Sequence, residues 1–535
     1  MRTPSLSCTG PQALLAAPPK KSKQKWPLGQ CVQALAAIVS VAIGLLAPVA
    51  VQAQNRLPTL GDGAELTTSA ERRLGDGIAR QLYRDPDYLD DPVLVEYVQT
   101  QWQALLAAAR AQGEVSPELD ERFAWEVLLG RDRSVNAFAL PGGYLGVHLG
   151  LIGVTASRDE LASVLAHELS HVTQRHIARL VAQQGKQAPL LLGSMILAVL
   201  AASKNPEAAQ ALAVGGQALA VQNQLNFSRD MEREADRVGF GLMDSAGFAP
   251  QGFVAMFDKL QQANRLNDNG SWPYLRSHPL TTQRQADMQA RLPAGGAQAQ
   301  PTLEHALMAA RARVQSRPGT DVLRQWMAEP QGSGFAELPA PRRAAALYAA
   351  ALAASHLRDV ALARKLLPRL QQTVQGDAVA QRQAGLLAAE VELAGGDASA
   401  ALRHLPPHPR TRPELLLRGQ ALLQAATKAP QPDAAALAAQ TESLQTWLAL
   451  HPRDAGAWLQ LAQLWQAQGV PLRAVRAEAE AHAARYDYAA AVDRFKAGQD
   501  LARRSTTAAD HVEASIIDTR LRAVESLLRE QAAER

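Results

Sequence analysis

The chain has 535 residues, of which 20% are charged, and its formal net charge is +4. This length exceeds what one hydrophobic core usually serves and suggests roughly three domain-sized units. The positive charge does not indicate a nucleic-acid-binding protein, because five basic residues and no acidic one lie in the first 53 residues, without which the net charge is −1.

The first 53 residues have the pattern of a secretory signal peptide. Four lysines within residues 20–25 precede an apolar run over residues 31–49, and residues 51–53 (VQA) form a small-x-small cleavage site. We therefore expect cleavage after Ala53 and export of the remainder. An uncleaved anchor is the alternative, since about 19 apolar residues can just span a bilayer, but Pro48 and the small-residue site favour cleavage.

Both cysteines of the chain, Cys8 and Cys31, lie in this segment. The exported chain therefore cannot form disulfides, and its fold must depend on core burial. Any metal ion must be held by histidine and carboxylate side chains.

The next part of the sequence predicts helices followed by a small sheet. Residues 63–112 have helical spacing of leucine and alanine on both sides of a turn cluster at residues 84–92, which predicts two helices. Residues 122–130 and 134–152 are short apolar or alternating stretches broken by glycine and proline, and they predict a small antiparallel sheet.

Residues 165–176, LAHELSHVTQRH, contain three of the twelve histidines of the chain. A capping-box pattern at Ser157 and helically spaced apolar residues predict one helix over about residues 158–184. Residues i and i+4 of a helix share a face, so His167 and His171 are candidate ligands of one zinc ion.

Glu168 lies on the flank of that face, where the HExxH pattern places a general base that acts on a metal-held water. His176 is nine residues beyond His167 and about half a turn around the helix. It is therefore expected to face solvent.

A catalytic zinc ion needs three protein ligands and one open position, so a third ligand is expected further along the chain. Glu232 and Asp236 share one face of a predicted helix over about residues 229–246. Glu232 is the candidate ligand, and Asp236 is expected to accept a hydrogen bond from a ligating imidazole. The alternative is that both acids pair with neighbouring arginines on a solvated helix face.

His278 precedes Pro279 in the loop SWPYLRSHPLTTQR, residues 271–284, and this proline favours an extended conformation. Three roles remain open: it orients substrate, stabilises a developing oxyanion, or binds the metal as a fourth ligand. The last role would close the site and produce a self-inhibited resting form.

Residues 189–202 are the most apolar stretch after the signal peptide, but about 14 residues are too few for a standard membrane span. We expect half of a helical hairpin packed beside the site. Insertion into a membrane surface is the alternative, so membrane contact is at most peripheral.

Residues 293–301, PAGGAQAQP, have the composition of a linker, and the rest of the chain predicts helices without strands. The spacing of bulky and small residues around 458–465 and 488–495 is tetratricopeptide-like, although the repeats are degenerate and an irregular bundle is the alternative. Stacked helical repeats form concave surfaces that bind proteins.

Four segments, HELSH, SRDMEREAD, SHPLTTQR and NAFALPGG, together resemble the HtpX-type and CAAX-prenyl-protease-type zinc metallopeptidases, a gluzincin group. The export signal and the helical-repeat tail are similar to the periplasmic members that serve outer-membrane protein assembly in Gram-negative bacteria. The resemblance extends from about residue 60 to the end and is most specific over residues 136–284.

The resemblance implies one zinc ion per chain, held by His167, His171 and Glu232, with Glu168 as the catalytic base. It also implies that Asp236 and His278 support the metal site. An active-site edge strand would bind substrate peptide as one further strand; its residues are Gly142, Gly143, Tyr144, Leu145, Gly146 and Val147.

We therefore expect a mostly α protein with a signal peptide over residues 1–53 and an α+β zincin-type metallopeptidase domain over residues 54–292. A linker over residues 293–301 and an all-α, TPR-like helical-repeat domain over residues 302–535 would follow.

The expected function is that of a zinc-dependent periplasmic endopeptidase that degrades misfolded or stalled outer-membrane proteins and assists their assembly. The tail would bind these proteins and the β-barrel assembly machinery, and no nucleic acid. The alternative is a chaperone or scaffold with a structural or silenced metal site.

Overall fold

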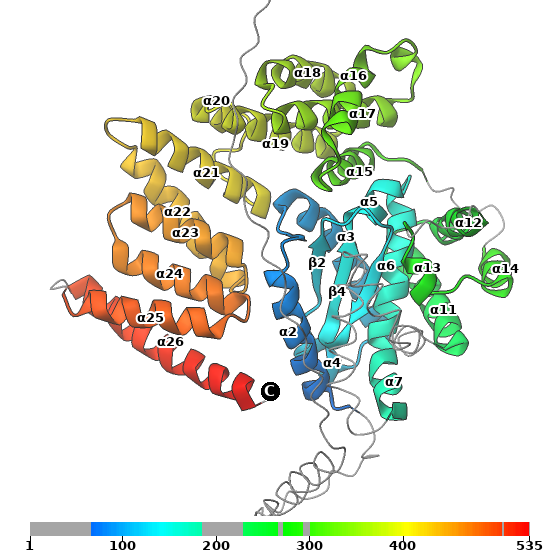
Figure 1. Cartoon of the computed structure of the whole chain (residues 1–535), viewed down its shortest axis with the longest axis horizontal. Coiled ribbons are helices and arrows are strands. Elements are labelled where there is room, and N and C mark those ends of the chain that lie inside the picture. Colours follow the sequence, from blue (N-terminus) through cyan, green and yellow to red (C-terminus); the bar gives the residue numbers. More distant parts are fainter. Residues whose placement is uncertain (1–65, 185–227, 266–270, 293–299, 505–507, 534–535) are drawn as a thin grey trace, which may run out of the picture. The chain divides into compact units, whose positions relative to one another are not determined.

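The computed structural model describes residues 66–184, 228–265, 271–292, 300–504 and 508–533 (Figure 1). The predicted signal peptide, the apolar segment 189–202 and most of the predicted linker lie outside the described residues. None of the described helices is long and apolar enough to cross a membrane.

Two helices precede the sheet, as the sequence predicts. Helix α2 (Thr68–Arg84) begins after Thr67, and α3 (Pro92–Ala111) begins after Asp91; both of these N-cap side chains accept hydrogen bonds from backbone N–H groups of the first turn. The turn cluster between the helices contains the short strand β1 (Tyr88–Leu89).

The sheet has the strand order β1-β2-β4-β3 and is mixed. Strand β2 (Glu126–Gly130) runs parallel to β4 (Tyr144–His148), whereas β3 (Ala137–Leu140) and β1 pair antiparallel with their neighbours. The predicted small sheet is therefore confirmed, but one of its strand pairs, β2 with β4, is parallel rather than antiparallel. Apolar alternation identifies a strand, but it does not determine the direction of the strand beside it.

Strand β4 lies in the interior of the sheet, between β2 and β3. The prediction that residues 142–147 form an edge strand is wrong, because both edges of Tyr144–Val147 are already paired. Gly142 and Gly143 belong to a 3-10 turn (Pro141–Gly143) and have φ angles of 74° and 82°. Within the described part of the chain, β3 is the strand at the edge beside β4.

Alternate residues of the sheet face two different layers. Val127 and Leu145, which pair in register, belong to the main core formed with α3 and α6. Leu128 and Tyr144 pack on the other side, against Ile78 of α2. The sheet is therefore covered on both faces.

The predicted helix over residues 158–184 is two helices, α6 (Arg158–Thr173) and α7 (His176–Gln184), which follow the short helix α5 (Leu149–Val154). Ser157 caps α6 by accepting a hydrogen bond from the N–H of Glu160. The prediction of one continuous helix is wrong, because the helix is interrupted at Arg175, whose φ angle is 53°.

After the undescribed residues 185–227, four helices complete the part of the fold that surrounds α6. They are α11 (Arg229–Ser245), α12 (Gln251–Arg265), α13 (Tyr274–Ser277) and α14 (Thr282–Arg291). Both α11 and α12 pack against α6.

The described residues from 300 onward form helices, two 3-10 turns and no strand, and Figure 1 shows the helices stacked in chain order from green to red. The helices are α15 (Leu303–Gln315), α16 (Thr320–Ala328), α17 (Ala340–His356), α18 (Val360–Thr373), α19 (Ala378–Ala394), α20 (Ala398–Arg403), α21 (Arg412–Lys428), α22 (Ala434–Leu450), α23 (Ala455–Ala467), α24 (Pro471–Ala484), α25 (Tyr488–Ala502) and α26 (Ala508–Ala533). The expected mostly α fold is confirmed, and the tetratricopeptide assignment stays a prediction.

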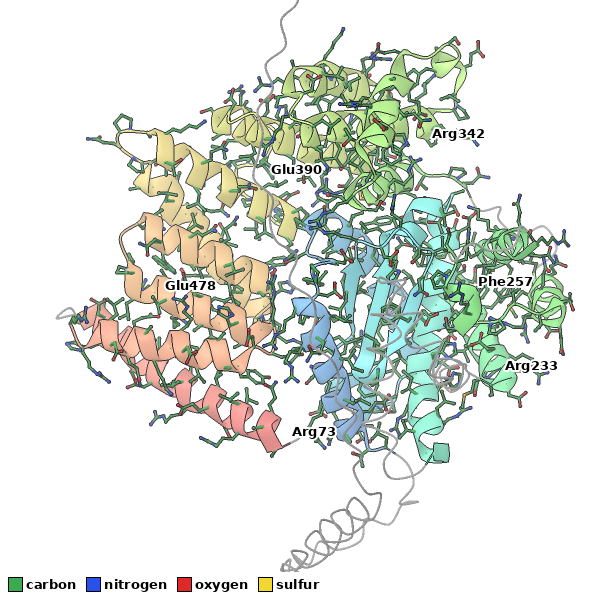
Figure 2. The ribbon with its side chains drawn as sticks, in the orientation of Figure 1. Arg73, Arg233, Phe257, Arg342, Glu390 and Glu478 are labelled. Carbon is green, nitrogen blue, oxygen red and sulfur yellow. The ribbon has the colours of Figure 1, made fainter. Side chains whose placement is uncertain are left out.

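A buried ion network joins the first of these helices to α3. Arg311 of α15 donates to Asp91, the N-cap of α3, over 2.9 Å and to Glu390 of α19 over 2.7 Å. Figure 2 labels Glu390. Asp91 therefore both begins α3 and binds α15.

Candidate metal centre

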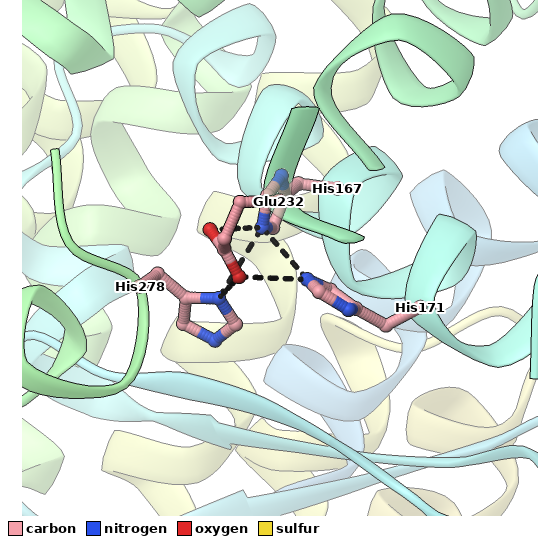
Figure 3. Close-up of side chains that lie close together, drawn as sticks. All are labelled: His167, His171, Glu232 and His278. Atoms are coloured by element: carbon pink, nitrogen blue, oxygen red, sulfur yellow. Dashed lines mark hydrogen bonds and ion pairs between the residues drawn. The ribbon is translucent and has the colours of Figure 1, made fainter. Parts of the chain in front are cut away.

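Three separate segments bring four potential metal ligands together (Figure 3). His167 and His171 come from α6, Glu232 from α11, and His278 follows α13 directly. All four residues are buried, and one ligand atom from each lies within 4.8 Å of the others.

The four ligand atoms are spaced as neighbours around one centre. His167 Nε2 lies 3.0 Å from His171 Nε2 and 3.3 Å from His278 Nδ1. Glu232 Oε1 lies 3.4 Å from His171 Nε2 and 2.9 Å from His278 Nδ1. Nitrogen and oxygen lone pairs gathered this closely in a buried site fit the donor set of a metal ion.

The helical spacing explains this convergence on both sides. His167 and His171 are one turn apart on α6, and Glu232 and Asp236 are one turn apart on α11. Asp236 Oδ1 lies 3.0 Å from His167 Nδ1, the ring nitrogen opposite the one in the ligand group. This contact has the distance of a hydrogen bond but not its alignment.

The ionisable groups are tuned by burial and by one another. Burial alone would raise the pKa of Glu232, but the His278 ring and hydrogen bonds from His167 and His171 hold it well below its ordinary value. Burial lowers the pKa of His171 well below its usual range, which leaves that ring neutral and able to donate a lone pair.

His167 differs from His171. Burial opposes its charged form, yet the nearby carboxylates of Asp236 and Glu232 raise its pKa to about 9. The two carboxylates therefore favour positive charge at this position, which a metal cation can supply in place of the proton.

Arg284, on α14, is a site residue that the sequence reasoning missed. Its Nε and Nη2 donate to the two oxygens of Asp236 over 2.6 and 2.7 Å, and its Nη1 lies 2.7 Å from Glu232 Oε2. A buried arginine usually has acidic partners. The sequence feature that could have identified Arg284 is its position in the first turn of the helix that follows SHPLTT.

Glu168 is fully buried beside the ligand group. Its Oε2 accepts a hydrogen bond from the N–H of Ala139 on β3 over 2.8 Å, and its Oε1 lies 3.4 Å from His278 Nε2. Among the described residues, Oε1 has no hydrogen-bond partner. An unsatisfied buried carboxylate oxygen is costly, so this atom fits a place where a water or substrate proton is received.

The predicted substrate strand, residues 142–147, does not provide the backbone contact to Glu168. The Tyr144 hydroxyl donates to Asp76 of α2 over 2.7 Å and lies 2.5 Å from the Tyr486 hydroxyl. The strand that contacts Glu168 is β3, through Ala139.

The expectation that His176 faces solvent is wrong, since its exposed fraction is 0%. Its Nδ1 lies 2.8 Å from His171 Nδ1, and its Nε2 lies 3.0 Å from Glu234 Oε2. Burial lowers the pKa of His176 to about 4. The left-handed conformation of Arg175, which costs roughly 1–2 kcal/mol for a residue other than glycine, turns the chain so that this ring is buried.

Comparisons with known proteins show which families and relatives this chain is similar to. Residues 95–292 match the model of peptidase family M48. The chain is 36% identical over 241 residues to a putative beta-barrel assembly-enhancing protease of Vibrio cholerae, which covers 44% of this chain and 47% of that protein.

Two further relatives extend the comparison. Identity to the beta-barrel assembly-enhancing protease of Escherichia coli is 32% over 256 residues, or 48% of this chain and 50% of that protein. Identity to the mitochondrial metalloendopeptidase OMA1 of Saccharomyces cerevisiae is 30% over 196 residues, or 35% and 53%. The chain spans about half the length of the curated relatives it matches.

Proposed function

We propose that this chain, which carries a peptidase family M48 domain over residues 95–292, is a zinc-dependent endopeptidase of the periplasm. Its substrates would be misfolded or stalled outer-membrane proteins, whose assembly it also assists. The observation that carries the proposal is the buried group of four ligand atoms with the Glu168 carboxylate beside it.

The donor set favours zinc. Three imidazole nitrogens and one carboxylate oxygen are ligands that zinc accepts in tetrahedral geometry. With bonds of about 2.0–2.1 Å, neighbouring ligands of such a tetrahedron lie about 3.3 Å apart. His167 Nε2 and Glu232 Oε1 each lie 2.9 to 3.4 Å from His171 Nε2 and His278 Nδ1, which is near this value, and all four atoms lie within 4.8 Å of one another.

The proposed reaction is peptide hydrolysis. Bound zinc would supply Lewis acidity, which makes a water nucleophilic near neutral pH and polarises the scissile carbonyl. Since Glu168 Oε2 is held by Ala139, Oε1 is the atom that takes a proton from water and delivers it to the leaving amine. Asp236 and Arg284 orient His167 and Glu232 through the contacts described above.

The substrate peptide is assigned to the edge of β3 (Ala137–Leu140). Added strands bind through main-chain hydrogen bonds at a sheet edge, and within the described residues β3 is paired only with β4. The Ala139 N–H that contacts Glu168 lies on this edge, so a peptide bound there would pass beside the proposed base.

His278 is proposed to occupy the fourth ligand position in a resting form. It lies at the end of the short helix α13, before Pro279, and its Nδ1 is within 3.3 Å of both His167 Nε2 and Glu232 Oε1. Substrate binding would then require this ring to leave the ligand group, because a catalytic zinc ion keeps one open position.

Localisation and partners rest on the export pattern and on the relatives. The first 53 residues predict export, and the relatives are named as proteases that enhance β-barrel assembly. We assign the helices from α15 onward to the binding of outer-membrane proteins and their assembly machinery, since stacked helices offer extended protein-binding surfaces.

The test is Glu168→Gln. The variant should retain about one zinc ion per chain and the wild-type melting temperature, and should lose cleavage of an unfolded outer-membrane protein by about 10²- to 10⁴-fold, the usual contribution of a general base. The matched control is Glu160→Gln, another buried glutamate of α6, which should keep cleavage. Undiminished cleavage by Glu168→Gln contradicts the proposed mechanism.

A second candidate function is a scaffold with a silenced metal, which the His278 contacts favour. The two functions differ in cells that carry Glu168→Gln as the sole copy. If assembly and removal of outer-membrane proteins both remain normal, the scaffold is the correct function; if removal fails, the peptidase is.

A further inference from the structure

We propose that His176 and Glu234 are positioning residues that hold the His171 ring in its metal-ligating orientation. The inference rests on the proposed metal site and adds a second support to it. Asp236 and Arg284 support His167, whereas His176 and Glu234 would support His171.

We call the series of contacts from His171 through His176 to Glu234 the relay. The hydrogen-bond directions along it are mutually consistent. His171 Nε2 belongs to the ligand group, so the proton of its neutral ring is on Nδ1. That N–H faces His176 Nδ1 at 2.8 Å, which accepts, and the His176 proton is then on Nε2. His176 Nε2 donates to Glu234 Oε2 over 3.0 Å.

The carboxylate that ends this relay is itself anchored. Arg179 Nη1 donates to the same Glu234 oxygen over 3.0 Å. Glu234 and Glu232 are two residues apart on α11, so they lie on different faces of that helix. One helix therefore supplies a ligand to the metal group and a support to the ring of another ligand.

The contact between the His171 and His176 rings depends on the break between α6 and α7. On a continuous helix His171 and His176 would lie about 140° apart, because each residue turns the helix by about 100°. The break at Arg175, with its φ angle of 53°, removes this separation. Arg175 Nε lies 3.2 Å from Glu71 Oε2, a buried carboxylate of α2 that anchors the turn.

A partner of this kind has a recognised effect on a metal site. A hydrogen-bond acceptor behind a ligating imidazole fixes its tautomer and ring orientation, and its loss typically weakens metal binding about 10- to 100-fold. A residue that only filled space would not require an acceptor atom at this position.

The experiment measures zinc affinity of the full chain by competition with a chromogenic chelator, and the absorption spectrum of the cobalt-substituted protein. We expect His176→Phe, which fills the space without an acceptor, to weaken zinc binding about 10- to 100-fold and to alter the cobalt spectrum. His176→Asn places an acceptor oxygen near the Nδ1 position and should recover most of the affinity.

Two further variants separate the relay from general stability. Glu234→Gln changes a half-buried side chain and should weaken zinc binding severalfold while the protein stays folded, so it decides the matter if His176→Phe does not fold. Asp230→Asn, which neutralises an acid of the same helix whose side chain is 83% exposed, should bind zinc within about twofold of wild type.

The outcomes distinguish this inference from the proposed function. If wild type binds zinc and His176→Phe binds it equally well, or if His176→Asn binds no better than His176→Phe, the relay is overturned and the peptidase proposal is untouched. If wild type binds no zinc, both proposals fail.

Discussion

Glu71 is a buried acid that contacts the turn between α6 and α7. Its side chain is 2% exposed, and its Oε2 lies 3.2 Å from Arg175 Nε. Burial, opposed by Arg175, raises the pKa of Glu71 from 4.5 to about 7. Glu71 therefore holds its proton more tightly in the folded chain than in the unfolded chain.

The pKa of Glu71 predicts how stability changes with pH. The stabilisation that protonated Glu71 provides is complete below pH 4.5 and is lost as pH rises through about 7. A rise in pKa from 4.5 to about 7 corresponds to roughly 3 kcal/mol. Glu71→Gln, which stays neutral, should remove this loss. The free energies of unfolding of the two proteins, measured by urea denaturation between pH 4.5 and 8, should therefore diverge as pH rises. Parallel curves would contradict the assignment.

At the scale of elements, Gly239 permits the close approach of α11 to α6 at the candidate metal ligands. A Cβ at this position would lie 3.0 Å from the carbonyl carbon of Ala166 and 3.1 Å from the nitrogen of His167. Glycine inside a helix costs about 1 kcal/mol relative to alanine. The close contact between the two helices accounts for a glycine at this position. Because α11 also carries Glu232, the same contact brings this carboxylate towards α6.

Gly241, two residues further on α11, provides a matched comparison. A Cβ there would meet only the Gln112 side chain, at 3.9 Å. Gly241→Ala should therefore stabilise the protein by about 0.5–1 kcal/mol, whereas Gly239→Ala should lower both the melting temperature and the zinc affinity because it separates Glu232 from α6. Equal gains from both substitutions would rule out the close-approach explanation.

At the scale of the whole molecule, the part that contains the candidate metal centre and the first helices of the tail share one hydrophobic core. The main core includes Trp102 of α3 and Leu165 of α6, and it continues through Leu307 of α15 to Ala421 of α21. Separate smaller cores lie in α21–α24, in α24–α26, and between α2 and the sheet. The composition change at residues 293–301 therefore does not mark the end of the first core.

Arg311 is expected to be the critical polar residue of this shared core. Its side chain and that of Asp91 are each 3% exposed, so Arg311→Met would leave buried carboxylates without a counter-ion. Removing one partner of such a pair costs about 3–5 kcal/mol. Arg324→Met, in an ion pair whose side chains are 69% and 98% exposed, should change stability by less than about 0.5 kcal/mol. Thermal unfolding of both variants checks the difference, and similar melting temperatures would contradict it.

The sequence by itself determined the features that depend on local spacing. The HExxH pattern places His167 and His171 one turn apart on a helix, and Glu232 and Asp236 have the same spacing. The two N-terminal helices and the helical tail also follow from local periodicity and capping. All of these features arise between residues that are close in the chain, where the geometry of one helix is sufficient.

Only the tertiary structure decided the features that depend on contacts between distant segments. No glycine, proline or asparagine marks the break at Arg175, and the burial of His176 depends on that turn. Packing between segments far apart in sequence likewise decides three other features. They are the interior position of β4, the position of Arg284 beside Asp236, and the approach of His278 to the ligand group. Such choices are made by the packing of whole elements, which no spacing within a single helix or strand specifies.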